Sequence, residues 1–271
     1  MLHCGLSWQP TVVRRVIETL STSTRPAIVE TDLGPGVLKG MGNPQGFESL
    51  VCELIAGELA CWLGLYVPPF SVVRVVGIDI PMRDRGHMEH GPAFISQKIP
   101  GAPSDAGDTF LRKIANPQDV AKLVAFDTLI RNGDRWPPDD TRQSPNFDNL
   151  FFSPSGRKFI LCALDHSHCF VETTFDNELD DDYVISDDRI YGYFPHFAPY
   201  LRPVYVVNAA NRLGQMTREV AAEIVDSVPR EWGLTGRQRA RFIDVICARA
   251  VLAREVMLTR LEDKSFDLGQ E

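Results

Sequence analysis

The period of the hydrophobic pattern changes near residue 100, and this change constrains the fold more than any other feature of the sequence. After it, apolar residues recur every three to four positions, as in Val120, Leu123 and Val124, which is typical of helices. Residues 217–228 and 235–261 are predicted to form two further helices. Before it, short alternating runs bounded by Gly, Pro or Asp predict strands over residues 11–16, 27–30, 36–38, 70–80 and 93–97. The sequence therefore predicts an α+β, two-lobed protein with a β-rich N-terminal lobe, residues 1–100, and a mostly helical C-terminal lobe, residues 101–271.

One helix is predicted inside the β-rich part, over residues 47–63. Its apolar residues follow helical spacing, and Gly64 provides a C-terminal stop. The helix carries two carboxylates, of which Glu58 falls within the apolar arc and Glu53 falls at its edge. We expect this helix to lie on the sheet.

The C-terminal part contains a predicted hairpin that brings distant polar residues together. Two apolar runs, residues 149–153 and 158–164, are joined by a Ser-Pro-Ser-Gly turn. Asn149 opens the hairpin and Asp165 follows its end. Asp134 comes just after the helix that Asn132-Gly133 terminates, so we expect three oxygen ligands to converge at one edge.

Such an oxygen set suits Mg²⁺, which takes one or two carboxylates together with phosphate oxygens and waters. Phosphoryl transfer requires little more than a metal, a carboxylate that orients the attacking hydroxyl, and a cation on the phosphates. Lys39, at the end of a predicted strand, supplies a candidate cation. Either Glu53 or Glu58 could hold it in an ion pair, and the pattern alone does not choose between them.

These residues resemble the HipA-like kinases, especially their short stand-alone members, which share a distant architecture with protein and phosphatidylinositol kinases. The resemblance covers the chain up to about Phe170 and rests on the order and spacing of its parts. The parts are Val37-Leu38-Lys39-Gly40, Asn43-Pro44-Gln45-Gly46, residues 50–56, Leu63-Gly64-Leu65, Val67-Pro68, Phe126-Asp127, Asp134-Arg135, Asn149-Leu150 and Leu164-Asp165-His166.

The resemblance implies an ATP- and Mg²⁺-dependent kinase whose acceptor is Ser or Thr, usually on a protein. It implies that Lys39 contacts the ATP phosphates and that Glu53, rather than Glu58, pairs with it. It further implies Asp134 as the catalytic carboxylate and Asn149 and Asp165 as metal ligands. ATP is then expected between the lobes, with the connecting backbone of Gln97, Lys98 and Ile99 facing the adenine.

Two departures from the family pattern affect this assignment. Fourteen residues separate Asp134 from Asn149, a longer interval than usual, so Asn146 remains a rival metal ligand. The loop after the first strand is Ser21-Thr22-Ser23-Thr24, where many kinases place glycines that let backbone amides approach phosphate. In the resembled family this loop can be phosphorylated on Ser, which implies an autophosphorylation site among residues 21–24 that would repel ATP.

Other groupings have simpler readings. His166 and His168 do not form a closed zinc set with Asp165 or Cys169, and we expect His166 to pack or hydrogen-bond. Residues 176–188 are acidic and predict a solvated loop, with recognition of a basic protein substrate as the alternative.

The cysteines form no CxxC pair and are interpreted as reduced thiols that pack as small apolar residues; they are Cys4, Cys52, Cys61, Cys162, Cys169 and Cys247.

Composition limits the partners and the location. The chain has 271 residues and a net charge of -8, which argues against nucleic-acid binding because such binding depends on clustered Lys and Arg. It lacks a long apolar run that would predict a membrane span, and residues 1–10 lack the features of a secretory signal. We therefore expect a cytoplasmic protein.

Two rival functions fit the same residues. One is a pseudokinase-like binding module, favoured by the hydroxyl-rich loop and opposed by the retained Lys39, Asp134, Asn149 and Asp165. The other is transfer of a different group, or of phosphoryl to a small molecule.

Overall fold

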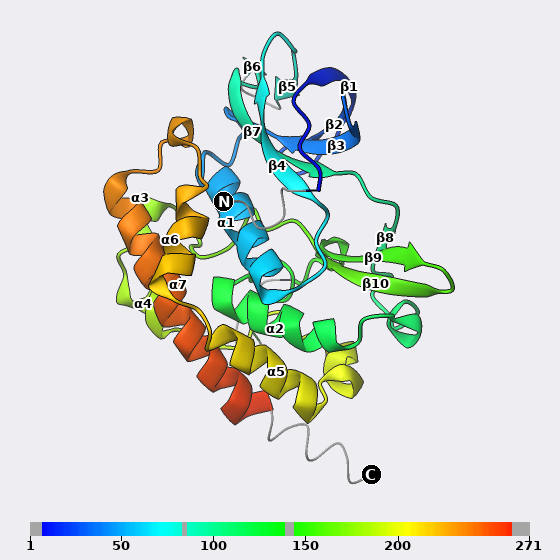
Figure 1. The fold of residues 1–271 in the computed structure, drawn as a ribbon, viewed down its shortest axis with the longest axis vertical. Helices are drawn as coiled ribbons and strands as arrows, with labels where there is room; N and C mark the ends of the chain where they lie inside the picture. The colour runs from blue at the N-terminus through cyan, green and yellow to red at the C-terminus, as the bar shows by residue number, and fades with distance from the viewer. Residues whose placement is uncertain (1–6, 83–85, 139–143, 262–271) are drawn as a thin grey trace.

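Alternating apolar residues in the N-terminal part form a five-stranded antiparallel sheet. The structure is a computed structural model that describes residues 7–82, 86–138 and 144–261. The sheet lies at the top of Figure 1, above the helical part. Its strands, in spatial order, are β1 (Val13–Thr19), β2 (Ala27–Thr31), β3 (Gly34–Lys39), β7 (Gly91–Gln97) and β4 (Phe70–Val75).

The single strand predicted over residues 70–80 is too long. β4 ends at Val75 because Gly77 adopts a positive φ of 71°, a conformation that breaks the extended chain. A short hairpin follows, made of β5 (Pro81–Met82) and β6 (Gly86–His87).

The two faces of the sheet have different roles, as the pleat of β3 illustrates. Leu38 is fully buried in a small core on one face, together with Val29 and Ile95. Its neighbours Val37 and Lys39 point to the opposite face and line a cavity. Because side chains alternate along the strand, the Lys39 ammonium lies on the side of the sheet that faces the rest of the molecule.

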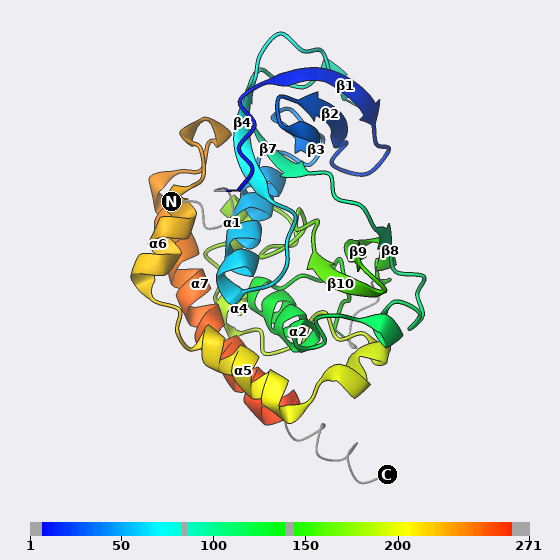
Figure 2. The same cartoon turned by 45° about the vertical axis from the view of Figure 1, so that its right-hand side comes forward.

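Helix α1 (Glu48–Leu63) lies between the sheet and the C-terminal helices, as Figure 2 shows from the side. It contacts β7 above and α2, α5 and α6 below, which explains why nearly all of its residues are buried. Phe47 precedes it, and Gly64, at φ 77°, ends it as the sequence predicts. Glu53 and Glu58 are both inside this layer.

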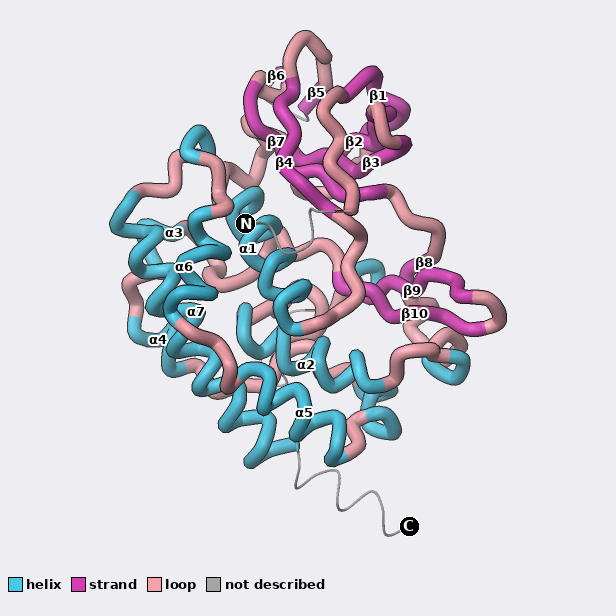
Figure 3. The backbone as a smooth tube through the Cα atoms, in the orientation of Figure 1, coloured by secondary structure: helices cyan, strands magenta, loops and turns pink. Residues whose placement is uncertain are grey.

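The C-terminal part is mainly helical, and Figure 3 separates it by colour from the strands above it. Four longer helices pack on one another there: α2 (Gln118–Ile130), α5 (Pro203–Leu213), α6 (Arg218–Asp226) and α7 (Gly236–Val256), the last continuing as a π-helical turn, Met257–Leu261. Thr235 begins α7 with a reciprocal capping box to Gln238. The sequence analysis predicted all of these helices except α5.

The predicted hairpin forms β9 (Leu150–Ser155) and β10 (Lys158–Ala163), with a third strand, β8 (Ala102–Pro103), beside β9. The α+β prediction, with its sheet-rich N-terminal part and helical C-terminal part, is confirmed. A lobe boundary at residue 100 stays a prediction. No helix among the described residues is long and apolar enough to span a bilayer.

The acidic stretch is largely exposed, as composition predicted, but it is not simply a loop. It contains two short helices, α3 (Phe175–Glu178) and α4 (Asp182–Ser186). Asp187 is buried and hydrogen-bonds to Arg131 at 3.0 Å and to Arg189 at 2.8 Å. Residue counting could not separate this buried carboxylate from its exposed neighbours.

The prediction of six free thiols is also wrong for one cysteine. Cys61 is disulfide-bonded, whereas Cys52, Cys162, Cys169 and Cys247 are free. Cys4 lies outside the described residues. Burial raises the pKa of the Cys162 thiol to about 12, so this cysteine is an inert packing residue as expected.

Acid should remove the stabilisation that Asp187 provides. Burial alone would raise the pKa of this carboxyl, but hydrogen bonds from Arg189, Tyr191 and Arg131 outweigh burial and hold it below its usual range. The unfolded carboxyl has a pKa of about 3.9, so the stabilisation is complete above about pH 5. It decreases as the pH falls from there towards the lowered pKa of the folded state.

We expect Asp187→Asn to lower the free energy of unfolding at pH 7 by on the order of 3 kcal/mol, because the buried guanidinium partners lose their counter-charge. The gap to wild type in urea unfolding should shrink between pH 5 and pH 3. The exposed neighbour Asp182, changed to Asn, is the control. A gap for Asp187→Asn that is constant across this range would contradict the assignment.

Candidate active site

A cavity of about 370 Å³ opens between the sheet and the β9–β10 hairpin. Its walls come from the lower face of the sheet, from α1 and from the exit of β10. Most of the wall is apolar, which suits a flat aromatic ligand. The apolar side chains include Leu20, Ile28, Val37, Phe94, Ile99 and Phe151.

Lys39 lies at the polar end of this cavity and is surrounded by acceptors. Its Nζ donates to Glu53 Oε2 at 2.7 Å, to Asp165 Oδ1 at 2.9 Å and to Ser167 Oγ at 2.8 Å. Three acceptors match the three donors of an ammonium group. The pair that forms is therefore Lys39–Glu53, although Glu58 is also buried on the same helix.

The charges of this network stabilise one another. Burial alone would lower the pKa of Lys39, but the carboxylates of Asp165 and Glu53 outweigh burial and raise it above its usual range. Burial would likewise raise the pKa of Asp165, but the Lys39 ammonium and the Ser167 hydroxyl hold it below its usual range. Both groups are therefore charged at neutral pH.

The backbone at the end of β10 is bent to make this contact. Asp165 has φ 56°, in the left-handed region that is uncommon for a residue with a side chain. The next amide, His166 N–H, donates to Glu53 Oε2 at 3.1 Å. Glu53 therefore holds both Lys39 and the chain that carries Asp165, which fixes the strained residue in place.

Asp134 and Asn149 form a second pair. Asn149 Nδ2 donates to Asp134 Oδ2 at 2.6 Å, and this orientation directs the amide Oδ1 away from the pair. Asn146, the rival ligand, caps the short 3₁₀ turn Phe147–Asn149 by accepting from the Asp148 N–H at 3.1 Å. The side chain of Asn146 thus has a local structural role, whereas that of Asn149 faces Asp134.

Arg135 links these groups from within the core. Its side chain is fully buried and forms an ion pair with Asp127 of α2. Its other nitrogens donate to the carbonyl oxygens of Asn149 and Leu164, each at 2.9 Å. One guanidinium thus connects the segment after α2 to both ends of the hairpin, next to Asp134, Asn149 and Asp165.

Asp134 and Asp165 nevertheless face different spaces. Asp165 lines the apolar cavity with Lys39, whereas Asp134 lines a neighbouring polar cavity of about 810 Å³. The three oxygen ligands therefore do not converge at a single point as expected. They lie in two groups, the Lys39–Asp165 network and the Asp134–Asn149 pair, and Arg135 connects the backbone of both groups.

A protein-family model described as HipA-like kinase matches residues 36–266. This chain belongs to the HipA-like kinases. A search of solved structures finds the crystal structure of the Helicobacter pylori proinflammatory kinase CtkA, with a TM-score of 0.60 and 10% sequence identity. The match covers 96% of this chain and 98% of that chain, and at this identity it shows the fold alone. A comparison with curated proteins returns no match.

The residues predicted to contact nucleotide in this HipA-like kinase divide into two sets. Thr22, Gln97, Lys98 and Ile99 line the apolar cavity, whereas Ser21, Ser23 and Thr24 do not. Ser21, Thr22 and Ser23 are exposed and Thr24 is buried, so the predicted autophosphorylation is confined by accessibility to the first three. That modification stays a prediction.

The donor set of this HipA-like kinase fits a magnesium-nucleotide better than a protein-only metal centre. No group of three or more His, Cys, Asp or Glu capable of holding a metal exists among residues 7–82, 86–138 and 144–261. One carboxylate, that of Asp165, and one amide oxygen, that of Asn149, would leave most ligand positions to phosphate and water, as Mg²⁺ prefers. A zinc centre at His166 is disfavoured by its position, since it is buried beside Arg135 and against the Phe126 ring.

Sequence reasoning missed two residues of the site. Ser167 bridges Glu53 and Asp165, and its position two residues after Asp165 was the available signal. The sequence pattern gives Arg135 no role beyond its place next to Asp134. The apolar run Trp136-Pro137-Pro138 that follows it was the available signal for its burial.

Gly192 packs against the Asp127–Arg135 pair, and a side chain there should disturb it. The residue has φ 71°, and an added Cβ would lie 2.7 Å from Asp127 Cβ. Gly233 has a similar φ of 83° but open space around its Cβ position. Gly233→Ala is therefore a matched control for the cost of placing a side chain on a residue with positive φ, without any steric contact.

We expect Gly233→Ala to cost about 1 kcal/mol of unfolding free energy and Gly192→Ala to cost at least about 1 kcal/mol more, because Asp127 must move. Urea unfolding of both variants measures the difference. Equal losses would show that Asp127 tolerates the displacement.

Proposed function

We propose that this HipA-like kinase transfers the γ-phosphoryl group of Mg²⁺-ATP to a Ser or Thr hydroxyl of a protein. The observation that carries the proposal is the Lys39 ammonium, bonded to Glu53 and Asp165 at the polar end of an apolar cavity. Family membership and a solved structure of a kinase with the same fold support phosphoryl transfer.

The apolar cavity is the proposed adenine site. Val37, Phe94 and Phe151 come from three different strands and would contact the two faces and edge of the base. In the connector after β7, Gln97 N–H donates to Pro69 O at 2.7 Å and Lys98 N–H to Pro35 O at 3.0 Å. These bonds fix the connector and leave Ile99, the next residue in the wall, as the proposed backbone contact to adenine.

Asn149 and Asp165 are the proposed metal ligands. When bound there, Mg²⁺ would neutralise the negative charge that develops on the phosphates during transfer. The Asp165 side chain is 37% exposed, so one of its oxygens can face a ligand while Oδ1 accepts from Lys39. Lys39, retained by Glu53, would contact the phosphates, and the network would thereby orient the triphosphate toward Asp134.

Asp134 is the proposed catalytic carboxylate. It lies on the polar-cavity side, where an acceptor hydroxyl can approach without entering the nucleotide cavity. Its bond from Asn149 fixes the orientation of the carboxylate that would accept the hydroxyl proton. In this proposal the phosphoryl donor and the acceptor approach one transfer point from the two cavities.

Removing the Asp134 carboxylate should abolish transfer without preventing nucleotide binding. We expect Asp134→Asn to lower the rate of ³²P transfer from labelled ATP by about 10²-fold or more, because a general base is lost. Asp148→Asn, an exposed change of the same kind near the hairpin, is the matched control and should retain activity.

Transfer by Asp134→Asn at the wild-type rate would remove Asp134 from the mechanism. If the wild-type protein binds nucleotide but transfers no phosphate to any protein or peptide, the pseudokinase-like binding module is favoured. If the ³²P label appears in a small molecule, a small-molecule kinase is favoured.

The two asparagines should differ in their effect on magnesium. We expect Asn149→Ala to raise the Mg²⁺ concentration needed for half-maximal activity by about 10-fold, because losing a group at a metal site lowers the affinity for the metal by about this factor. Asn146→Ser keeps a capping side chain and should leave the Mg²⁺ dependence unchanged. A titration in which only the Asn146 variant shifts would reverse the assignment.

A further inference from the structure

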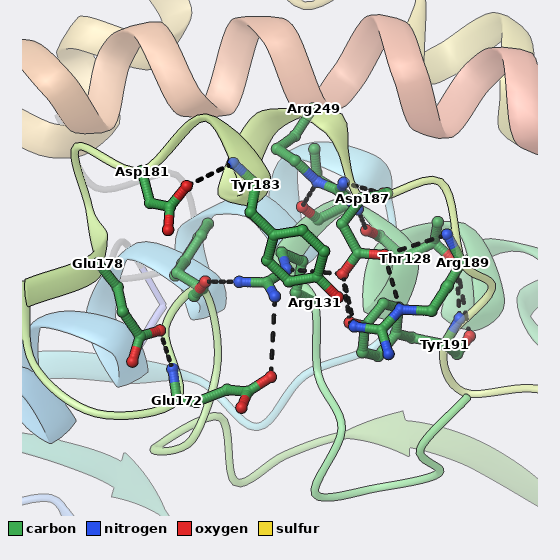
Figure 4. Close-up of polar contacts among 12 residues, drawn as sticks. Thr128, Arg131, Glu172, Glu178, Asp181, Tyr183, Asp187, Arg189, Tyr191 and Arg249 are labelled. Carbon is green, nitrogen blue, oxygen red and sulfur yellow. Dashed lines mark hydrogen bonds and ion pairs between the residues drawn. The ribbon is translucent and has the colours of Figure 1, made fainter. Parts of the chain in front are cut away.

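The polar cavity beside Asp134 has a wall of arginine and tyrosine that phosphoryl transfer itself does not require. Arg131, Arg189, Tyr183 and Tyr191 line this cavity together with Glu172. Figure 4 shows these side chains gathered around Asp187, beneath α7. The wall is built from segments on both sides of the acidic stretch, so it is a tertiary feature and not a local turn.

The buried side chains in and behind this wall carry more positive than negative charge. Arg131 in the wall and Arg249 behind it are buried, with 3% of the Arg131 side chain exposed. Among the described residues labelled in Figure 4, Asp187 is the one buried carboxylate, and it accepts from Arg131 at 3.0 Å. Arg249 instead donates to the backbone oxygens of Asp187, Thr128 and Leu129. One buried cation is therefore not matched by a buried anion.

One edge of Arg131 faces a weakly held counter-ion. Its Nε and Nη1 are committed to Asp187 and to the Phe170 carbonyl, at 3.0 and 2.7 Å. Its Nη2 lies 3.9 Å from Glu172 Oε1, too far for a hydrogen bond, and the Glu172 side chain is 66% exposed. An incoming anion can therefore displace Glu172 at low cost, since an exposed ion pair contributes little.

The arginines are held in place before any ligand binds. The Tyr183 ring lies between the two guanidiniums, 5.0 Å from that of Arg131 and 5.5 Å from that of Arg189. Arg189 also donates to Tyr191 Oη at 3.0 Å, and that hydroxyl donates to Asp187 at 2.6 Å. A preorganised guanidinium loses little side-chain freedom on binding, which favours recognition of carboxylate or phosphate.

We propose that the Arg131–Arg189 face of this cavity binds an acidic or phosphorylated side chain of the acceptor polypeptide, beside the hydroxyl that Asp134 receives. The proposal rests on the proposed function for the role of Asp134, but the anion site itself does not depend on turnover. Glu172 occupies the site in the absence of acceptor and competes with it. A basic residue at this position would meet the buried positive charge and be disfavoured.

Peptide binding tests the proposal without requiring catalysis. The probes are fluorescent peptides with alanine at the acceptor position and Glu, phosphoserine, Gln or Lys at each flanking position in turn. We expect Glu or phosphoserine at one position to bind about 10-fold more tightly than Gln, with Lys weakest, as for a charge-assisted hydrogen bond. Comparison of Glu with phosphoserine distinguishes the two sources of the anion.

Two variants locate the effect. Glu172→Gln removes the competing carboxylate from an exposed position and should tighten binding of the acidic peptides by about 3-fold or more. Glu255→Gln, an exposed change on α7, is the matched control and should have no effect. Arg131→Lys keeps the charge but loses the fork geometry and should remove the preference for acidic peptides.

Equal binding of the Glu, Gln and Lys peptides, or no binding of any, would overturn the proposal. So would a Glu172→Gln variant that leaves binding of the acidic peptides unchanged. Restoring serine at the acceptor position and adding labelled ATP separates this inference from the proposed function. An acidic preference in binding with no ³²P transfer contradicts only the proposed function, whereas transfer with no charge preference contradicts only the anion site.

Discussion

The arrangement of this molecule depends on one buried guanidinium. Taking the Arg135 charge out of water costs several kcal/mol, and that cost is offset only if the group is fully paired and hydrogen-bonded. Asp127 supplies the counter-charge from α2, and the carbonyl oxygens of Asn149 and Leu164 accept the remaining bonds. Because these acceptors lie on three separate segments, Arg135 can be satisfied only when α2 and both ends of the hairpin are assembled around it.

A second network builds on the first at the exit of β10. Arg135 holds the Leu164 carbonyl, and Lys39 and Ser167 then hold the carboxylate of the next residue, Asp165. Glu53 accepts from Lys39 and from the His166 amide, so α1 of the N-terminal part is bonded to a loop of the C-terminal part. The charged residues of the site therefore add a polar connection between the sheet-rich part and the helical part to the apolar contacts of α1.

The sequence predicted those elements whose signal is local. Alternation located the strands, spacing located α1, α2, α6 and α7, and the Ser-Pro-Ser-Gly turn located the hairpin. The pattern could not choose Glu53 over Glu58, because α1 is covered on all sides and both carboxylates are buried. The burial of Asp187 within the acidic stretch could not be predicted for a related reason, because it depends on arginines distant in sequence. The partition of Asp134 and Asp165 between two cavities is likewise a tertiary property.

The most direct test is a crystal structure with Mg²⁺ and a non-hydrolysable ATP analogue. The account predicts adenine in the apolar cavity, phosphates against Lys39, and one metal held by Asp165 and the Asn149 Oδ1, with the terminal phosphate facing Asp134. A nucleotide whose phosphates point away from Asp134, or a metal that contacts neither Asn149 nor Asp165, would contradict it.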